Sequence, residues 1–400
     1  MKSIRSVFKI GHGPSSSHTM GPAKAAQKVK ELYPNHSYKV ILYNSLALTG
    51  EGHLTLVVIK DILEYVSFEK EIDLSVHPNQ LVFEVYKDSK LIKKIFVQSI
   101  GGGEIIFDGH QTVYKSIYKE TTFDEIKDYM TKHNLSLIDY IKKYEPQEIF
   151  TYLEEVFEQM CRTIEEGLEG EGLLPGDLKV QRKANALYKN ALSLPNGSLK
   201  DRTLLSAYAF ATGEQNASGG LMVTAPTCGA SGVLPAILYY VYKIEKESKD
   251  KIIEALAIAG LIGNLIIQNA SISGAVAGCQ AEIGSACSMA AAAYAYIKGE
   301  TVEQIEYAAE IAMEHYLGLT CDPVGGYVQI PCIERNAVAA TRAINASELA
   351  LVLFETRKIS FDMIVKTMYQ TGLDMDSKYK ETSEAGLAYF YKELEKWKKQ

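Results

Sequence analysis

The sequence lacks the positive charge that nucleic-acid-binding and membrane-adhering proteins use. Its 42 Lys and Arg residues are outnumbered by 49 Asp and Glu residues, and the formal net charge is −7 at pH 7. Binding to phosphate backbones or anionic lipid surfaces is driven by clustered basic side chains. We therefore expect no nucleic-acid partner and no membrane partner.

Long hydrophobic runs are also missing. The first ten residues, MKSIRSVFKI, contain no apolar core of the length found in signal peptides. The most apolar region, residues 251–298, is interrupted by polar side chains, so that no stretch is expected to approach the roughly 20 apolar residues of a membrane span. These features predict a cytoplasmic protein with buried helices.

Cysteine is absent from the first 160 residues, and the six cysteines that follow do not predict a disulfide framework. In a reducing compartment such thiols are free, catalytic or bound to a metal. The start of the cysteine-bearing part coincides with a change in hydrophobic patterning, which indicates a chain of two parts.

The first part, residues 1–145, is predicted to be an α/β domain. Residues 38–48, 81–86 and 91–98 have the alternation and β-branched content of strands. Residues 21–33 and 54–66 have the apolar spacing of helices. The charged, weakly patterned stretch 116–147 is the expected boundary.

The second part, residues 146–400, is predicted to be almost entirely α-helical, which makes the whole protein α+β. The predicted helices are 147–168, 179–192, 198–212, 232–246, 251–270, 280–297, 301–317, 335–358 and 383–398. Gly- and Pro-rich connections at 224–232 and 320–332 separate some of them, and chemistry is more often found in such loops than in helix interiors.

Three cysteines are candidates for one metal centre. Cys321 and Cys332 end a loop rich in Gly and Pro that can fold back and bring both sulfurs together, and Cys279 stands at the Gly-rich entry to the next predicted helix. Three soft thiolates with one open position suit a [4Fe–4S] cluster with an exposed iron or an open zinc site. The alternative is that buried cysteines act as small hydrophobes, which is our interpretation of Cys161 and Cys287.

The role of Cys228 is left open by its surroundings. It lies in APTCGASG, just before a predicted helix whose free amides would favour an anion and lower a thiol pKa. A nucleophile, part of a carboxylate cradle and a small thiol packed under a tight turn are all compatible with this position.

A hydroxyl-rich segment, GHGPSSSHTMGP at residues 11–22, leads directly into the 21–33 helix. Ser15, Ser16, Ser17 and Thr19 supply more hydroxyls than one helix cap needs, and His18 adds a further donor, so the segment is suited to a carboxylate or phosphate. The alternative is a cap within a merely polar loop.

A second histidine, His53, lies in the Gly-rich turn LTGEGHLT at residues 48–55. A histidine in such a turn can transfer a proton near neutral pH. A solvated loop histidine is the alternative.

Taken together, these motifs resemble the iron–sulfur-dependent L-serine dehydratases, also called L-serine ammonia-lyases. The match runs in order from about residue 7 to 390 and comprises GPSSSHTMGPAKAA, SLALTGEGH, GGG, LLPGDLKV, APTCGASGVLPA, AGCQAEIGSACSMAAAA, CDPVGGYVQIPCIERNA and YKETSEAGLA.

The resemblance implies an N-terminal domain similar to an allosteric substrate-binding domain, followed by a helical domain that carries the cluster. It implies that Cys279, Cys321 and Cys332 hold a [4Fe–4S] cluster whose open iron acts as a Lewis acid on L-serine, giving pyruvate and ammonia, as in amino-acid catabolism and gluconeogenesis. It also implies that His53 is the base, that the segment from Ser15 to Thr19 (Ser15, Ser16, Ser17, His18 and Thr19) binds substrate, and that the enzyme is a homodimer without pyridoxal phosphate.

Two departures from the family pattern affect these expectations. Longer relatives carry a C-terminal cysteine that occupies the fourth iron, whereas this sequence has no cysteine after Cys332, so water or a small anion is the expected fourth ligand. Family members often have an aspartate soon after the GH motif, where this sequence has Leu56 and Val57. If that aspartate orients the base, another group must do so here.

Three other functions are compatible with parts of the pattern. A pyridoxal-phosphate serine dehydratase would perform the same reaction, but no lysine has the sequence context of its Schiff-base site. An iron–sulfur L-cysteine desulfidase would share the cluster, and a non-catalytic iron–sulfur sensor would not need the hydroxyl-rich segment.

Overall fold

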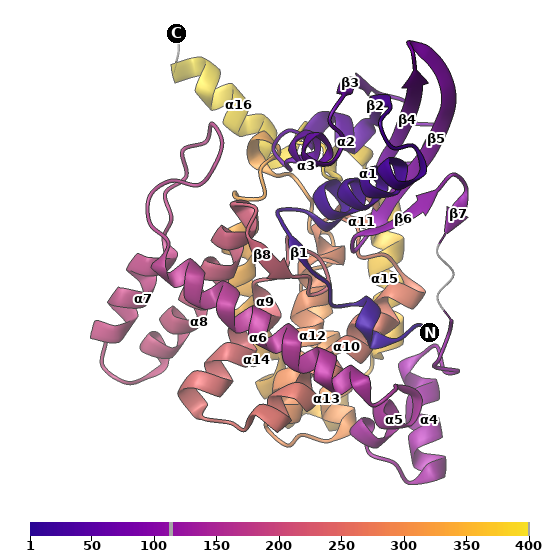
Figure 1. The fold of residues 1–400 in the computed structure, drawn as a ribbon. Coiled ribbons are helices and arrows are strands. Elements are labelled where there is room, and N and C mark those ends of the chain that lie inside the picture. Colours follow the sequence, from indigo (N-terminus) through magenta and orange to yellow (C-terminus); the bar gives the residue numbers. More distant parts are fainter. Residues whose placement is uncertain (112–114, 399–400) are drawn as a thin grey trace.

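The computed structural model describes residues 1–111 and 115–398 and confirms the predicted α+β class (Figure 1). The strands are β1 Ile10–His12, β2 Ser37–Tyr43, β3 Val66–Glu71, β4 Gln80–Lys87, β5 Lys90–Gly101, β6 Glu104–Phe107, β7 His110–Gln111 and β8 Leu221–Val223. The α-helices are α1 Gly21–Leu32, α2 Asn44–Thr49, α3 Thr55–Ile62, α4 Phe123–His133, α5 Leu137–Tyr144, α6 Glu148–Glu169, α7 Ala184–Ser193, α8 Ser198–Ala217, α9 Val233–Tyr240, α10 Lys249–Asn269, α11 Gly274–Ala277, α12 Ile283–Ile297, α13 Val302–Glu314, α14 Cys332–Leu353, α15 Phe361–Asp374 and α16 Gly386–Lys398. Short 3₁₀ or π turns are η1 Ile4–Ser6, η2 Ser16–Met20, η3 Val241–Glu245, η4 Cys279–Ala281, η5 Val324–Gly326, η6 Phe354–Thr356 and η7 Ser377–Tyr379.

A six-stranded sheet in the order β3-β2-β4-β5-β6-β7 forms the N-terminal part. The β2–β3 pair is parallel and the other pairs are antiparallel, with Val40 opposite Phe83 in the β2–β4 register. Buried side chains on one face of the sheet pack with Val29 of α1 and Ile59 of α3 in one cluster. The helices therefore cover one face of the sheet, as an amphipathic layer architecture requires.

Residue Phe83 offers a test of this core. Its side chain is fully buried, whereas Phe96 on the neighbouring strand β5 is 51% exposed. We expect Phe83→Ala to lower the free energy of unfolding by about 3–5 kcal/mol, because it leaves a cavity between sheet and helices. The Phe96→Ala variant is the matched control and should change the midpoint of urea unfolding little; equal effects of both variants would contradict this packing.

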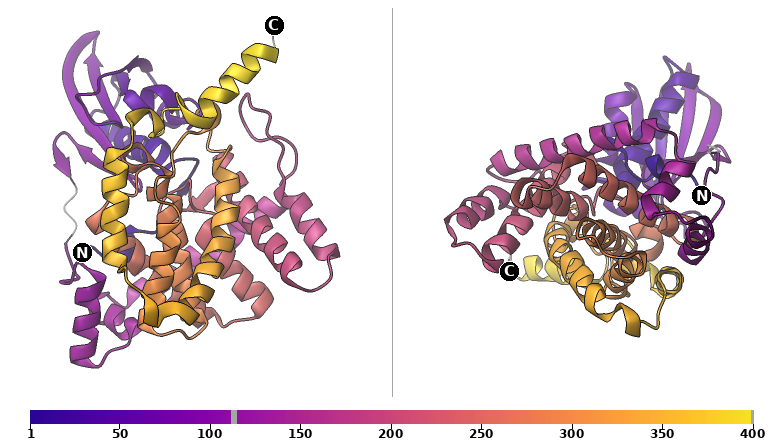
Figure 2. Two further views of the ribbon diagram at one scale, coloured as in Figure 1. Left: turned by 180° about the vertical axis from the view of Figure 1, so that it is seen from behind. Right: turned by 90° about the horizontal axis from the view of Figure 1, so that it is seen from below.

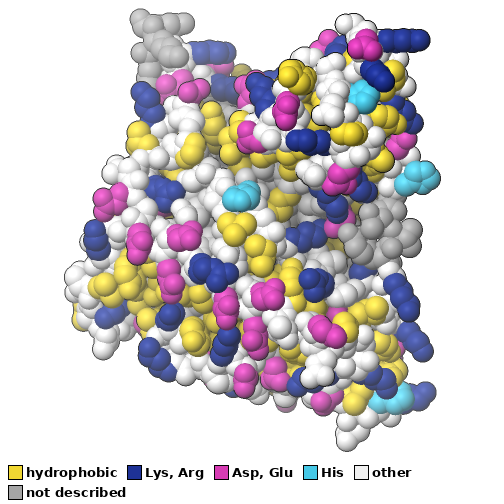
Figure 3. Space-filling model, viewed as in Figure 1, with side chains coloured by type: hydrophobic (Ala, Val, Ile, Leu, Met, Phe, Trp, Pro, Cys, Tyr) yellow, Lys and Arg dark blue, Asp and Glu magenta, His cyan; other side chains and the backbone are white. Residues whose placement is uncertain are grey.

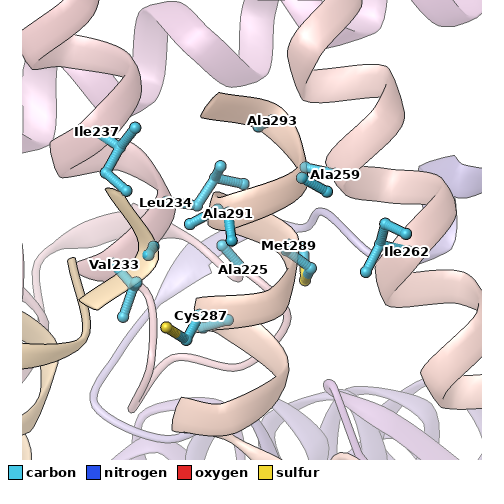
Figure 4. Packing of buried hydrophobic residues seen from close by; sticks show 14 of the residues in the cluster. Ala225, Val233, Leu234, Ile237, Ala259, Ile262, Cys287, Met289, Ala291 and Ala293 are labelled. Carbon is cyan, nitrogen blue, oxygen red and sulfur yellow. The ribbon is translucent and has the colours of Figure 1, made fainter. Parts of the chain in front are cut away.

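Helix α12 is the centre of the helical part. Its sequence IGSACSMAAAAYAYI is almost wholly buried, and it packs against α9, α10, α13 and α14. Figure 4 shows Met289, Ala291 and Ala293 of α12 between residues of α9 and α10. Small side chains let neighbouring helices approach closely, so the alanine run is explained by its central position.

The N-terminal segment joins the two parts. Strand β1 pairs antiparallel with β8 of the helical part, with Ile10 opposite Val223. From there the chain enters η2 and α1, and the Lys9 ammonium contacts the carboxylate of Glu104 and the Gly102 carbonyl next to β6. These contacts place the hydroxyl-rich segment, residues 11–22, between the sheet and the helices.

The stretch 116–147, expected to be a weakly patterned boundary, contains two helices. Capping boxes at Thr122 with Glu125 and at Ser136 with Asp139 begin α4 and α5. Their apolar side chains join the core of the helical part. The division of the chain at residue 145 stays a prediction.

Other differences from the predicted elements are local. Residues 38–48 were predicted as one strand but form β2 and then α2, because Asn44 has a positive φ of 48° and turns the chain. Helix α15 was not predicted. Helix α16 extends away from the body of the protein (Figure 2) and presents Leu387, Phe390 and Leu394 at its surface.

Within residues 1–111 and 115–398, two helices are long and apolar enough to cross a bilayer, which corrects the expectation that no stretch approaches that length. Helix α10 has a mean hydropathy of 1.6 and residues 332–356 have 1.4. In α10, 78% of the apolar window is buried inside the protein; in the second it is 39%. Such helices are weak indicators of a membrane protein, because core helices have the same composition. On the face in Figure 3, acidic and basic side chains are interspersed.

Candidate active site

A small cavity lies where the N-terminal turns meet the helical part. Its lining residues are Pro14, Ser15, His53, Gly229, Cys279, Glu282, Ile283, Cys321, Pro323, Val328, Cys332 and Glu381. The structure thus brings five of the residues singled out from the sequence, namely Ser15, His53 and the three cysteines, to one place.

The three cysteines reach the cavity from separate elements. Cys279 lies in η4, Cys321 lies in the connection after α13, and Cys332 begins α14. The connection between the last two can fold back because Gly325 and Gly326 adopt φ values of 63° and 75°, which glycine tolerates best. All six cysteines of the chain are free thiols, and Cys161 and Cys287 lie outside this lining.

The three thiols of the cavity lie close enough to shift one another's pKa values. A hydrogen bond from Cys321 and the charge of the Arg335 guanidinium lower the pKa of Cys279 to about 7 despite its burial. The hydrogen bond to Cys279, followed by burial, raises the pKa of Cys321, and burial raises the pKa of Cys332. Arg335 is held by hydrogen bonds to the Thr320 carbonyl at 2.7 Å and to Asp322 at 3.3 Å. The Arg335 cation therefore favours the thiolate form of Cys279.

The donor set fits a [4Fe–4S] cluster. Three soft sulfur donors converge, as such a cluster with one open iron needs, and an open zinc site would use the same set. Gly274 leaves room beside them, since a Cβ at this position would lie 3.2 Å from Cys321 Sγ and 2.8 Å from Glu282 Oε2. The residues present are compatible with either group.

His53 is oriented by a backbone carbonyl. Its Nδ1 lies 2.9 Å from the Thr49 oxygen, which can only accept, so Nδ1 carries the proton. The lone pair of Nε2 then points toward Glu381, whose Oε1 lies 3.4 Å away. A neutral imidazole in this tautomer has its basic nitrogen on the side of the cavity.

His18 is buried behind His53, with the ring centroids 4.6 Å apart. The Ser45 hydroxyl donates to the Glu381 carbonyl at 2.7 Å and accepts from His18 Nε2 at 2.9 Å. The Ser17 hydroxyl lies 2.9 Å from His18 Nδ1, which is therefore the accepting nitrogen. Burial lowers the pKa of His18 to about 4, so the ring is neutral at physiological pH.

The hydroxyls of the hydroxyl-rich segment mostly hold His18 and His53 in place. Thr19 donates to the His53 carbonyl at 2.7 Å and accepts from the Ser15 amide, and Ser17 contacts His18. Ser16 is buried, and within the described chain Ser15 is the only hydroxyl-bearing residue of the segment in the cavity lining. Of the hydroxyls predicted to face the substrate, only that of Ser15 therefore belongs to a residue that lines the cavity within the described chain.

Glu381 is a site residue to which the sequence analysis assigned no role. It follows Lys380, which forms a β-bridge with Cys321, and the Glu381 amide donates to the Cys321 carbonyl at 2.7 Å. Burial alone would raise the pKa of its carboxyl, but the adjacent His18 and His53 bring it below the usual range. Its φ of 59° is the left-handed conformation, which is uncommon for a residue with a side chain. The only sequence signal was its place in the YKETSEAGLA motif.

Two further buried groups complete the surroundings. Burial, followed by repulsion from Glu381 and Cys279, raises the pKa of Glu282 well above its usual range. Cys228 is buried with its sulfur 3.7 Å from Met20 Sδ, and burial raises its pKa. A raised pKa disfavours the thiolate form that a nucleophile needs, so Cys228 is best interpreted as a packed thiol.

The chain is similar over nearly its whole length to known enzymes. Residues 3–63 match the family model of the serine dehydratase beta chain, and residues 60–388 match that of the alpha chain. It is 38% identical to an L-serine dehydratase of Haemophilus influenzae and to L-serine dehydratase 1 of Escherichia coli, covering 97% of this chain and 99% of each relative. An L-serine dehydratase of Helicobacter pylori is also 38% identical, over 96% of this chain and 98% of the relative. The chain therefore belongs to the serine dehydratase family, with the beta-type and alpha-type parts fused in one polypeptide.

Proposed function

We propose that this lyase is an iron–sulfur L-serine dehydratase, which converts L-serine to pyruvate and ammonia and does not use pyridoxal phosphate. Cys279, Cys321 and Cys332 are the proposed ligands of a [4Fe–4S] cluster. The observation that carries the proposal is the convergence of these three thiols with the accepting nitrogen of His53 on one small cavity.

The proposed reaction is an elimination. When bound, the cluster supplies a Lewis acid at the iron without a cysteine ligand, which makes hydroxide an easier leaving group. His53 Nε2 removes the Cα proton of serine, because Nδ1–H is committed to the Thr49 carbonyl. The aminoacrylate that forms tautomerises to an imine and hydrolyses to pyruvate and ammonia.

Glu381 is the proposed positioning group for this base. Family members often carry an aspartate after the GH motif, where this chain has Leu56 and Val57. A carboxylate 3.4 Å from His53 Nε2 stabilises the imidazolium that forms when the proton is taken. Ser15, which lines the same cavity, is the proposed hydroxyl contact for the substrate carboxylate, and the other residues of the segment hold the site together.

A homodimer in the cytoplasm is the proposed form of the enzyme. The apolar stripe of α16, with Leu387 45%, Phe390 71% and Leu394 52% exposed, supports association with another surface. Light scattering on the purified protein checks this; the mass of a single chain across the accessible concentration range would contradict it.

The test of the proposed function is one preparation assayed in two ways. Anaerobically purified protein is expected to contain iron and inorganic sulfide and to release pyruvate from L-serine faster than from L-cysteine, with L-threonine as a further comparison. Faster turnover of L-cysteine would support a desulfidase instead. Cluster-bearing protein that turns over none of the three would support a sensor, and full activity without iron and sulfide would contradict the proposed mechanism.

A further inference from the structure

Three metal-ligating atoms converge beside the cavity, apart from the cysteines. The Nδ1 of His18 and the Nε2 of His53 each lie 3.4 Å from the same oxygen, Oε1 of Glu381. The three atoms lie within 4.8 Å of one another, and all three residues are buried.

The outer hydrogen bonds leave His53 Nε2 and His18 Nδ1 as the accepting nitrogens on the side of Glu381, where His18 Nδ1 accepts from the Ser17 hydroxyl. His53 donates its Nδ1–H to the Thr49 carbonyl, and His18 donates its Nε2–H to Ser45. Metal-binding histidines have this arrangement, in which the nitrogen away from the metal donates to a fixed acceptor and thereby sets the tautomer.

Both nitrogen–oxygen contacts with Glu381 are longer than ordinary hydrogen bonds. Hydrogen bonds of the N–H···O type span about 2.7–3.2 Å, and neither inward nitrogen has a hydrogen to offer in these tautomers. In these tautomers the lone pair of His53 Nε2 faces Glu381 Oε1 at 3.4 Å, whereas the lone pair of His18 Nδ1, also 3.4 Å from Oε1, accepts from the Ser17 hydroxyl at 2.9 Å. A positive charge at this point, either a proton or a metal ion, would bind both His53 Nε2 and the carboxylate, and a metal that also binds His18 Nδ1 would displace the Ser17 hydroxyl from it.

The spacing suits a tetrahedral metal ion. Zinc binds His nitrogen and carboxylate oxygen at about 2.0–2.2 Å, which places two ligand atoms roughly 3.3–3.5 Å apart at the tetrahedral angle. Both nitrogen–oxygen separations already have this value. To bring the two nitrogens from at most 4.8 Å to the same spacing, each would move by less than about 1 Å.

We propose that His18, His53 and Glu381 form a binding site for a divalent cation of the zinc class, with two imidazoles, one carboxylate and one open position. Imidazole ligands suit Zn²⁺ and Co²⁺ rather than Mg²⁺ or Ca²⁺. The cation occupies the lone pair of His53 and so inhibits the enzyme. Binding of the cation stands on the geometry alone, whereas inhibition rests on the proposed function.

The experiment uses the anaerobic holoenzyme with its cysteines occupied by the cluster, because free thiols would compete for the ion. Titration with Co²⁺ is expected to give one equivalent per chain, with the visible bands of tetrahedral Co²⁺ but no thiolate-to-cobalt charge transfer, and unchanged iron content. Zn²⁺ is expected to displace the Co²⁺ and to suppress pyruvate release from serine until a chelator is added.

Matched variants identify the ligands. Glu381→Gln keeps the shape but removes the charge, and we expect it to weaken Co²⁺ binding at least about tenfold; Ser45→Ala, which removes an outer partner of His18, should weaken it by roughly 10–100-fold. His12→Ala, at an exposed histidine whose Nδ1 lies 2.9 Å from the Gly219 carbonyl, should not change it.

Three outcomes would overturn the site: no saturable Co²⁺ binding, a thiolate charge-transfer band, or equal affinity in Glu381→Gln. The first would assign a proton to the space between the rings. Co²⁺ bound with the expected spectrum but without loss of serine turnover would support the site and overturn the inhibition. A holoenzyme without serine turnover would contradict the proposed function, and its Co²⁺ spectrum would still decide whether the site exists.

Discussion

Replacing Cys321 with serine is expected to remove the iron–sulfur cluster and serine turnover together. A hydroxyl is a poor substitute for a thiolate as a ligand to iron, and Cys321 stands among the other two sulfurs, hydrogen-bonded to Cys279. Iron content should fall from about four atoms per chain toward zero. Iron and sulfide analysis, visible absorbance and pyruvate release measure the three consequences on one preparation.

The matched control is Cys161→Ser. Cys161 is a partly buried thiol in α6, outside the cavity lining, so its replacement should leave cluster and turnover intact. Circular dichroism of the Cys321→Ser protein would separate loss of the cluster from loss of the fold. A Cys321→Ser protein with full iron content, or with full activity and no iron, would remove Cys321 from the proposed ligands.

Replacing His53 with alanine is expected to lower kcat for serine by roughly 10²–10⁴-fold while the cluster absorbance stays unchanged. His53 lines the cavity, and its Nε2 is the accepting nitrogen because Nδ1 donates to the Thr49 carbonyl. The loss of a base affects proton removal from Cα, whereas the sulfurs proposed to hold the cluster are on other elements. Steady-state kinetics together with the visible spectrum separate the two effects.

His12→Ala serves as control for this variant too, since His12 is an exposed histidine in β1. Unchanged turnover in His53→Ala would exclude His53 as the base. A simultaneous loss of the cluster would mean that the ring is needed for the structure of the site, and the conservative variant His53→Gln would then test the base, since it keeps much of the volume and has no imidazole.

Much of the fold could be predicted because hydrophobic spacing is a local property. The pattern at 21–33 gave α1 within a residue, and 81–86 and 91–98 gave the cores of β4 and β5. The stretch 116–147 was missed as helical although α4 and α5 are amphipathic and begin at capping boxes; these short helices are also supported by packing against the helical core. Residue spacing does not reveal support of this kind.

The site was predictable in its residue types but only partly in their roles. The sequence indicated the cysteines and His53, and all four reach the cavity. It also indicated a row of hydroxyls for the substrate, yet Ser17 and Thr19 bond to His18 and to the His53 backbone. A hydroxyl donates and accepts equally well in either setting, so its partner cannot be identified from its position in a motif.

The sequence by itself determined the two-part α+β organisation, the absence of a basic surplus and the set of sulfur and imidazole groups available for chemistry. The tertiary structure alone decided that Glu381, 328 residues after His53, faces both buried imidazoles. That contact depends on the pairing of Lys380 with Cys321 and on a left-handed backbone at Glu381. Local propensity and periodicity act over a few residues, whereas contacts between distant segments exist only once the chain has packed.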